Sequence, residues 1–256
     1  MKPVIKKNIA DSFSAQYLNY QSAATFHEEC ADSLLSELKA LVLKEGFFLE
    51  IGSHTGVMSS KLQGLCATKK MQSIRIDLQS CGESLITAED NAKFLKADGE
   101  ALPFSENVFQ CIVSNATFQW FSEWETSLQK IMKCLKVDGH LVFSQFINPS
   151  LEPLKSWYRE IERPDAFIDL VDFDKLKELL SSYETCKVLS LEKELYFTDL
   201  KELFGFLKMM GVNAPSKNLN RLTKSQTQKL KMLSEKSRLG KGIPLKLCAA
   251  IVVITK

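Results

Sequence analysis

The sequence lacks the features that mark several large classes of protein. No stretch approaches the roughly 18 consecutive apolar residues that a membrane-spanning helix needs, and the first thirty residues contain no apolar block of the signal-peptide type. Charge of one sign is also missing, because 33 basic residues face 31 acidic ones and the net charge is +2. These absences argue against a membrane protein and a nucleic-acid-binding surface, and they predict a cytoplasmic location.

Cysteine and histidine occur without the spacing of a metal site. The seven cysteines are an odd number and form no Cys-x-x-Cys pair, so neither a disulfide framework nor a zinc site is expected. Cys111 and Cys248 lie in apolar runs and are predicted to be small buried residues. Of the three histidines, His27 and His140 are interpreted as structural or surface residues.

Apolar runs and amphipathic segments alternate along the first 150 of the 256 residues. Strands are expected at 47–51, 72–77, 94–97, 108–114 and 139–146, and helices at 56–66, 82–92 and 123–135. This alternation predicts an α/β fold with a mostly parallel sheet and crossover helices. Two later strands, 186–197 and 247–254, bring the Rossmann-like sheet to seven strands.

Further helices are expected on both sides of this alternating region. A helix over 29–44 would bury Leu34, Leu38 and Val42 on one face and end at Gly46. Later in the chain, the segments 151–182, 199–210 and 223–238 are predicted to be helical.

The most informative motif is the glycine-bearing turn after the first expected strand. It reads Glu50-Ile-Gly52-Ser53-His54-Thr-Gly56. Glycine lets the backbone approach a ligand closely and tolerates a positive φ, and a helix that begins there directs N–H groups at the ligand. An ordinary strand–helix turn explains the motif alone about equally well.

Acidic residues follow the next two strands at distances that suit a nucleoside. Asp77 ends the second strand, where a carboxylate can accept both hydroxyls of a ribose, and Leu78 would contact the base. Asp98-Gly99 closes the third strand and offers an acceptor for an exocyclic amino group. Each has a simpler reading, since Asp77 could be a helix N-cap and Asp-Gly a plain turn.

The loop after the fourth strand should line the same pocket, because ligands bind beyond the carboxyl ends of strands in open α/β sheets. Its residues include Asn115, Gln119 and Trp120. We interpret Gln119 and Trp120 as pocket residues, while core packing remains the alternative for Trp120 and for Phe118 and Trp124.

Together these motifs resemble the S-adenosylmethionine site of seven-stranded, class I methyltransferases. Over nearly the whole length the chain also resembles the malonyl-acyl carrier protein O-methyltransferase family of biotin synthesis. The segments that carry this second resemblance are Phe13 with Tyr20, Ser114-Asn115 with Gln119-Trp120, Trp157 with Glu162-Arg163-Pro164, Leu195-Tyr196-Phe197, and 221–226. The sequence departs from the family pattern at His54, where the family usually has glycine, and at Leu247, where tyrosine is common.

The resemblance implies methyl transfer from S-adenosylmethionine to the free carboxylate of a malonyl thioester. The implied cofactor-binding residues are Glu50, Gly52, Ser53, His54, Gly56, Asp77, Leu78, Asp98, Gly99 and Asn115. The implied acyl-positioning residues are Tyr20, Arg163, Gln119 and Trp120, with no general base and no metal. Arg163 would pair with the acyl carboxylate, although a surface ion pair with Glu160 or Glu162 explains it equally well.

The resemblance also implies how the chain is divided into segments and which partner it binds. Residues 1–46 would form a helical segment over the cofactor, 47–150 the cofactor-binding core, and 151–256 a helical cap with the closing strands. Basic residues within 217–246 would meet an acidic acyl carrier protein, or simply form a solvated helix face. Two other functions stay open: methylation of another small acid or a quinone, and a non-catalytic assembly factor, which the substitution at His54 keeps in view.

Overall fold

The computed structural model describes residues 25–79, 92–210 and 222–256. The helices are α2 (Thr25–Ala40), α3 (Val57–Thr68), α4 (Trp124–Cys134), α5 (Leu154–Glu160), α6 (Phe173–Leu180), α7 (Leu200–Met209) and α8 (Lys224–Lys236), with short 3-10 turns η2 (Phe118–Trp120) and η3 (Pro164–Ala166). The strands are β1 (Phe47–Ile51), β2 (Gln72–Asp77), β3 (Ala92–Lys96), β4 (Phe109–Ser114), β5 (Leu135–Phe146), β6 (Thr185–Phe197) and β7 (Ile243–Thr255).

The strands form one seven-stranded sheet in the order β3-β2-β1-β4-β5-β7-β6. Strands β3, β2, β1, β4 and β5 pair in parallel, whereas β7 is antiparallel to both of its neighbours. The prediction of a Rossmann-like, mostly parallel sheet with seven strands is therefore confirmed. The strand order reverses between β1 and β4, which is the place where open α/β sheets bind ligands.

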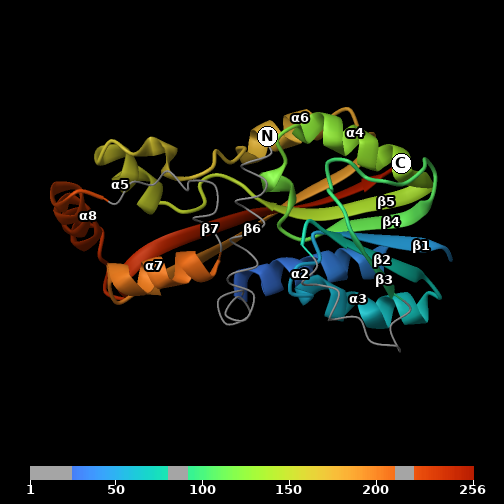
Figure 1. The fold of residues 1–256 in the computed structure, drawn as a ribbon, viewed down its shortest axis with the longest axis horizontal. Helices are drawn as coiled ribbons and strands as arrows, with labels where there is room; N and C mark the ends of the chain where they lie inside the picture. Colours follow the sequence, from blue (N-terminus) through green and yellow to red (C-terminus); the bar gives the residue numbers. More distant parts are fainter. Residues whose placement is uncertain (1–24, 80–91, 211–221) are drawn as a thin grey trace.

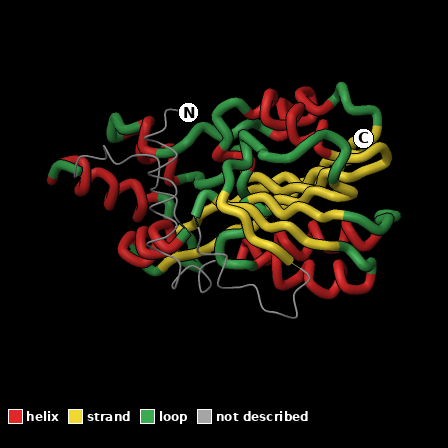
Figure 2. Tube along the Cα trace, turned by 45° about the vertical axis from the view of Figure 1, so that its right-hand side comes forward, coloured by secondary structure: helices red, strands yellow, loops and turns green. Residues whose placement is uncertain are grey.

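Helices cover both faces of the sheet, as Figures 1 and 2 show. Alternate residues of a central strand point to opposite faces, so Cys111 and Val113 of β4 belong to one core while Ile112 belongs to the other. The first core includes side chains of α2, α3, α5, α7 and α8, and the second includes those of α4 and α6. Both cores are continuous, which explains why the strands read as unbroken apolar runs.

At one side of the sheet, the long antiparallel strands β6 and β7 extend past the shorter strands, and α5, α7 and α8 lie at their far end (Figure 1). Helix α5 packs against α8 there, and the Trp157 indole N–H donates to Ser237 Oγ at 3.2 Å. Helix α6 instead lies with α4 over the second core. The segment 151–182 is thus two helices in different places and not one continuous helical stretch as expected, with Pro164 at the start of the turn that separates them.

Several element boundaries differ from the expectation. Helix α2 ends at Ala40 and not near Gly46, so Val42 is 81% exposed although the helical pattern predicted it to be buried. Leu34 and Leu38 are buried as predicted. The expected helix 82–92 lies almost wholly outside the described residues, and only Ala92, the first residue of β3, is seen.

Candidate active site

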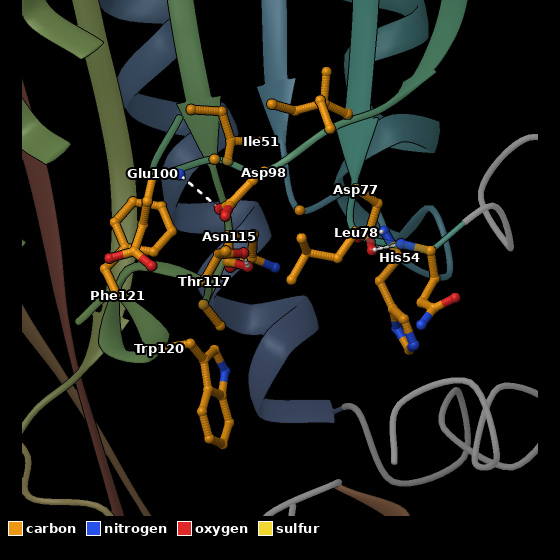
Figure 3. Close-up of a pocket in the computed structure, with 16 residues that line it drawn as sticks. Ile51, His54, Asp77, Leu78, Asp98, Glu100, Asn115, Thr117, Trp120 and Phe121 are labelled. Carbon is orange, nitrogen blue, oxygen red and sulfur yellow. Dashed lines mark hydrogen bonds between the residues drawn. The ribbon is translucent and has the colours of Figure 1, made fainter. Parts of the chain in front are cut away.

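A pocket opens at the carboxyl ends of β1, β2 and β4 and beside the turn after β3 (Figure 3). Its lining residues are Ile51, Gly52, His54, Ile76, Asp77, Leu78, Gln79, Ala97, Asp98, Gly99, Glu100, Asn115, Ala116, Thr117, Trp120 and Phe121. The loops that the sequence singled out therefore meet around one cavity.

The turn after β1 requires glycine at position 52. Gly52 has φ of +76°, and a Cβ atom on it would overlap the Thr117 side chain. The amides of Gly52 and Ser53 both donate to the carbonyl of Ile76, at 2.9 and 3.2 Å, so β2 fixes the turn. His54 follows with φ of +35°, a left-handed conformation that is uncommon for a residue with a side chain.

Asp77 connects this turn to the loop after β2. Its Oδ2 accepts a hydrogen bond from the amide of His54, and its Oδ1 accepts one from the amide of Gln79, both at 3.0 Å. Each carboxylate oxygen can accept a second bond, so the side chain can also receive two hydroxyl donors from a ligand. Leu78 lines the pocket beside it (Figure 3).

Asp98 and Gly99 form the opposite wall. Asp98 Oδ1 accepts from the Glu100 amide at 3.0 Å, which closes a local turn. A Cβ on Gly99 would lie 2.7 Å from Ile51 Cγ2 and 3.0 Å from the Phe121 ring, so only glycine lets this turn approach the strand. The cavity is thus lined by both carboxylate oxygen atoms and apolar side chains. This combination suits the polar ribose and the flat base of a nucleoside.

Glu100 is a pocket residue that the sequence analysis did not identify. Its Oε1 accepts from the amides of Ser122 and Glu123, at 2.6 and 3.0 Å, and from the Ser122 hydroxyl at 2.9 Å. A buried carboxylate therefore holds the loop before α4 against the turn after β3. The signal available in the sequence was an acid beside Asp98-Gly99, but nothing there reveals its partners twenty residues later.

Glu50, by contrast, lies behind the turn and not in the pocket. Its side chain is buried, accepts from Ser59 Oγ at 2.6 Å and lies 3.8 Å from Arg75 Nε. Burial raises the pKa of this carboxyl from 4.5 to about 7, against the opposing effects of Ser59 and Arg75. Ser53 and Gly56 are likewise absent from the lining; Gly56 is the N-cap of α3 with φ of +77°.

Asn115 joins the pocket to α2. Its Nδ2 donates to the carbonyl of His27 at 3.0 Å, and its Oδ1 accepts from the Ser144 hydroxyl at 2.6 Å. Ser144 Oγ in turn accepts from the amide of Ala116 at 2.9 Å. This network positions the loop after β4 relative to α2 and β5.

A second, mostly apolar pocket adjoins the first at Trp120. Its lining residues are His27, Gln119, Trp120, Phe146, Ser150, Leu151, Phe167, Ile168, Leu170, Phe206, Leu207, Met210 and Leu247. Gln119 Nε2 donates to the carbonyl of Ala116 at 2.6 Å. Burial lowers the pKa of His27 to about 3, with a smaller effect from His54, so the imidazole is neutral at physiological pH.

Of the two remaining predicted positions, only Arg163 lies within the described residues. Tyr20 lies outside the described residues. Arg163 lines neither pocket; its Nε lies 3.9 Å from Asp165 Oδ1, and its side chain is 16% exposed. Neither pocket has a lysine or arginine among its described lining residues.

The predicted burial of Cys111 and Cys248 is confirmed, and five of the six cysteines in the described ranges are buried. These six cysteines form no disulfide; Cys81 lies outside those ranges. Within residues 25–79, 92–210 and 222–256, no group of three histidine, cysteine or acidic residues could hold a metal ion. In the same ranges no helix is long and apolar enough to cross a membrane.

Comparisons with known proteins agree with this geometry. Residues 49–143 match a family model described as a methyltransferase domain. The malonyl-[acyl-carrier protein] O-methyltransferase of Calditerrivibrio nitroreducens is 29% identical over 209 residues, which cover 78% of this chain and 80% of the relative. The enzyme of the same name from Acetivibrio thermocellus is 26% identical, covering 83% and 80%.

A solved structure shares the fold at low sequence identity. The YcgJ protein of Bacillus subtilis superimposes with a TM-score of 0.61 at 15% identity, covering 89% of this chain and 98% of that protein. Residues 49–143 are therefore similar to methyltransferase domains, the fold is that of class I methyltransferases, and the similarity to malonyl-[acyl-carrier protein] O-methyltransferases extends well beyond these residues.

Proposed function

We propose that this protein transfers the methyl group of S-adenosylmethionine to the free carboxylate of a malonyl group on acyl carrier protein. The observation that carries the proposal is the junction of the two pockets at Trp120, which gives a nucleoside-type site and an apolar acceptor site a shared wall. Similarity to enzymes named for this reaction supports the substrate. The product, a malonyl methyl ester, would start the acyl chain of biotin.

The chemistry suits a site without an evident base. A carboxylate is already ionised at neutral pH, so no proton has to leave before attack. One carboxylate oxygen forms the new bond to the methyl carbon while the sulfonium C–S bond breaks, leaving S-adenosylhomocysteine. Placing the two reactants in line can by itself lower the barrier by about 7–11 kcal/mol.

The cofactor roles follow from the pocket walls. Asp77 would accept the ribose hydroxyls, with Leu78 against the base, and Asp98 with the Gly99 backbone would contact the adenine edge. Gly52 and His54 would lie beside the methionine part. Glu50, Ser53 and Gly56 would act indirectly by shaping the turn, since none of them lines the pocket.

The acceptor roles are revised from the sequence-based expectation. Gln119 and Trp120 remain our candidates for positioning the acyl group, because both line the acceptor pocket. A direct clamp by Arg163 has less support, since it lines neither pocket. Acyl positioning by Tyr20, a helical cap formed by residues 151–256, and a cytoplasmic location stay predictions.

The carrier protein would approach the basic residues of 217–246. Within the described part of this range, Lys224, Lys229 and Lys231 of α8 are exposed. Their charge would attract an acidic carrier and orient it toward the far end of the paired strands β6 and β7.

The decisive experiment incubates the protein with donor labelled at the methyl carbon and malonyl-acyl carrier protein. A base-labile labelled methyl ester is expected, with weaker labelling of malonyl-CoA and little of small free dicarboxylates. Preferential labelling of a small acid or a quinone would redirect the assignment to that acceptor. If no acceptor is labelled and titration detects no binding of S-adenosylhomocysteine, the non-catalytic interpretation replaces the enzyme.

A further inference from the structure

The apolar acceptor pocket adjoins a third hollow of different chemistry. Phe167 and Ile168 line both of them. The third hollow is otherwise polar, and its remaining lining residues are Asn148, Pro149, Glu152, Lys155, Arg159, Pro164 and Asp169. Moving outward from Trp120, where the donor and acceptor pockets meet, the lining is therefore first apolar and then polar and charged.

Lys155 is the group in this hollow that an anion would meet. Its Nζ donates to the neutral side-chain oxygen of Asn148 at 3.3 Å, and no carboxylate of the described residues lies within 4 Å of it. Partial burial lowers the pKa of this amine from its usual value, while Glu152 and Asp169 oppose that shift. A half-buried ammonium with only a neutral partner has unused capacity for an anion.

Arg159 supplies a second cation at the rim. Its Nη2 donates to Glu152 Oε1 and to Ser156 Oγ, both at 2.8 Å. Glu152 is held further by the amide and hydroxyl of Ser156, so this carboxylate is already compensated. Asp169 is the remaining acid in the lining, and it offers an acceptor for N–H or O–H donors.

The chemistry of a pantetheine thioester follows the same order. From the reacting carboxylate outward, such an arm has a methylene, a thioester and an ethylene unit, then two amides and a hydroxyl, and finally a phosphate ester. We propose that the arm runs from Trp120 through the apolar pocket and that Lys155 and Arg159 bind its phosphate end. Asp169 then accepts from an amide or hydroxyl of the arm. This inference rests on the proposed function, because it assumes an acceptor carried on phosphopantetheine.

The test measures binding directly, without methyl transfer. Phosphopantetheine and unphosphorylated pantetheine are titrated against the whole protein in the presence of S-adenosylhomocysteine. The wild-type protein should bind the phosphorylated arm about tenfold more tightly, as expected for a charge-assisted hydrogen bond. Lys155→Gln should abolish this preference, whereas Lys155→Arg, which keeps the cation, should retain most of it.

Lys175→Gln is the matched control, because this exposed lysine pairs with Glu178 on α6 and lines none of the three hollows. It should behave as the wild type. Equal binding of both arms by the wild-type protein, or an unchanged preference in Lys155→Gln, would overturn the inference. Failure of the proposed function would appear differently, as absence of a labelled methyl ester from malonyl-acyl carrier protein with the phosphate preference intact.

Discussion

Single residues decide the shape of the donor pocket, and Gly52 is the clearest case. Gly52→Ala should weaken binding of S-adenosylhomocysteine by about tenfold or more, because the new Cβ would collide with Thr117 and the backbone has φ of +76°. Calorimetric titration measures this loss. Gly64→Ala is the control: nothing lies within 4 Å of its added Cβ, and in the middle of α3 it should raise the unfolding free energy by about 0.5–1 kcal/mol while affinity stays unchanged.

Glu50 should make the stability of the protein depend on pH. Its pKa is raised from 4.5 to about 7 in the folded protein, so the folded state holds the proton more tightly than the unfolded chain does. The free energy of unfolding should therefore fall as the pH rises from 4.5 to about 7, and it should stay lower at higher pH. Glu50→Gln should remove that contribution, which denaturant titrations at a series of pH values would detect.

A control for this effect is Glu106→Gln, which alters an exposed carboxylate 3.8 Å from Lys133. Its stability should follow the pH dependence of the wild type. If the unfolding free energy of the Glu50→Gln protein depended on pH in the same way as that of the wild type, the buried carboxyl would not be the source of the pH dependence.

At the scale of elements, α7 links folding to the acceptor pocket. Asp199 caps this helix by accepting from the Glu202 amide at 2.8 Å, and Phe206, Leu207 and Met210 line the pocket at its other end. Asp199→Ala should cost about 1 kcal/mol of stability and raise KM for a malonyl thioester, with the affinity for S-adenosylhomocysteine unchanged. Initial-rate kinetics with malonyl-CoA tests this.

Thr223→Ala removes the equivalent cap of α8, which forms a capping box with Gln226 but supplies no residue to the acceptor pocket. It should lose similar stability without the change in KM. If KM rose in both variants, the cause would be a general loss of stability and not a specific effect of α7 on the acceptor pocket.

Much of the element order could be predicted, because parallel strands that are buried on both faces are continuous apolar runs in the sequence. The break in 151–182 was missed although Pro164 signals it; what the sequence does not show is that α5 and α6 pack against different cores. Val42 was misplaced for a related reason: it continues the helical spacing of Leu34 and Leu38, but α2 stops two residues earlier.

The candidate site was predictable where backbone geometry demands a residue type, as at Gly52 and Gly99. Asp77 and Asp98 could be found because strand ends of a parallel sheet converge. Glu100 was not predicted because it is bonded to the backbone amides of Ser122 and Glu123. The sequence does not show which backbone amides lie near a given side chain. Arg163 was chosen from the family resemblance and from the fit of a guanidinium to a carboxylate, and neither shows the direction in which a side chain points.

At the scale of the whole molecule, the distribution of charge should affect recognition of the carrier. A Lys224→Glu, Lys229→Glu, Lys231→Glu triple variant should raise KM for malonyl-acyl carrier protein by about tenfold at low salt, and the difference should shrink as ionic strength rises. KM for malonyl-CoA should change little. Lys130→Glu on α4, an exposed position over the other face of the sheet, should leave both values unaltered.

The interior position of β7 has a consequence for synthesis on the ribosome. Both β5 and β6 are made before β7, yet each of them pairs with β7 and not with the other. Until residues 243–255 emerge, the edges of two nascent strands have no intramolecular partner, a state in which chains aggregate. Strands β1 to β4 pair among themselves much earlier, so we expect this half of the sheet to fold first and chaperones to act mainly on the half that contains β6 and β7.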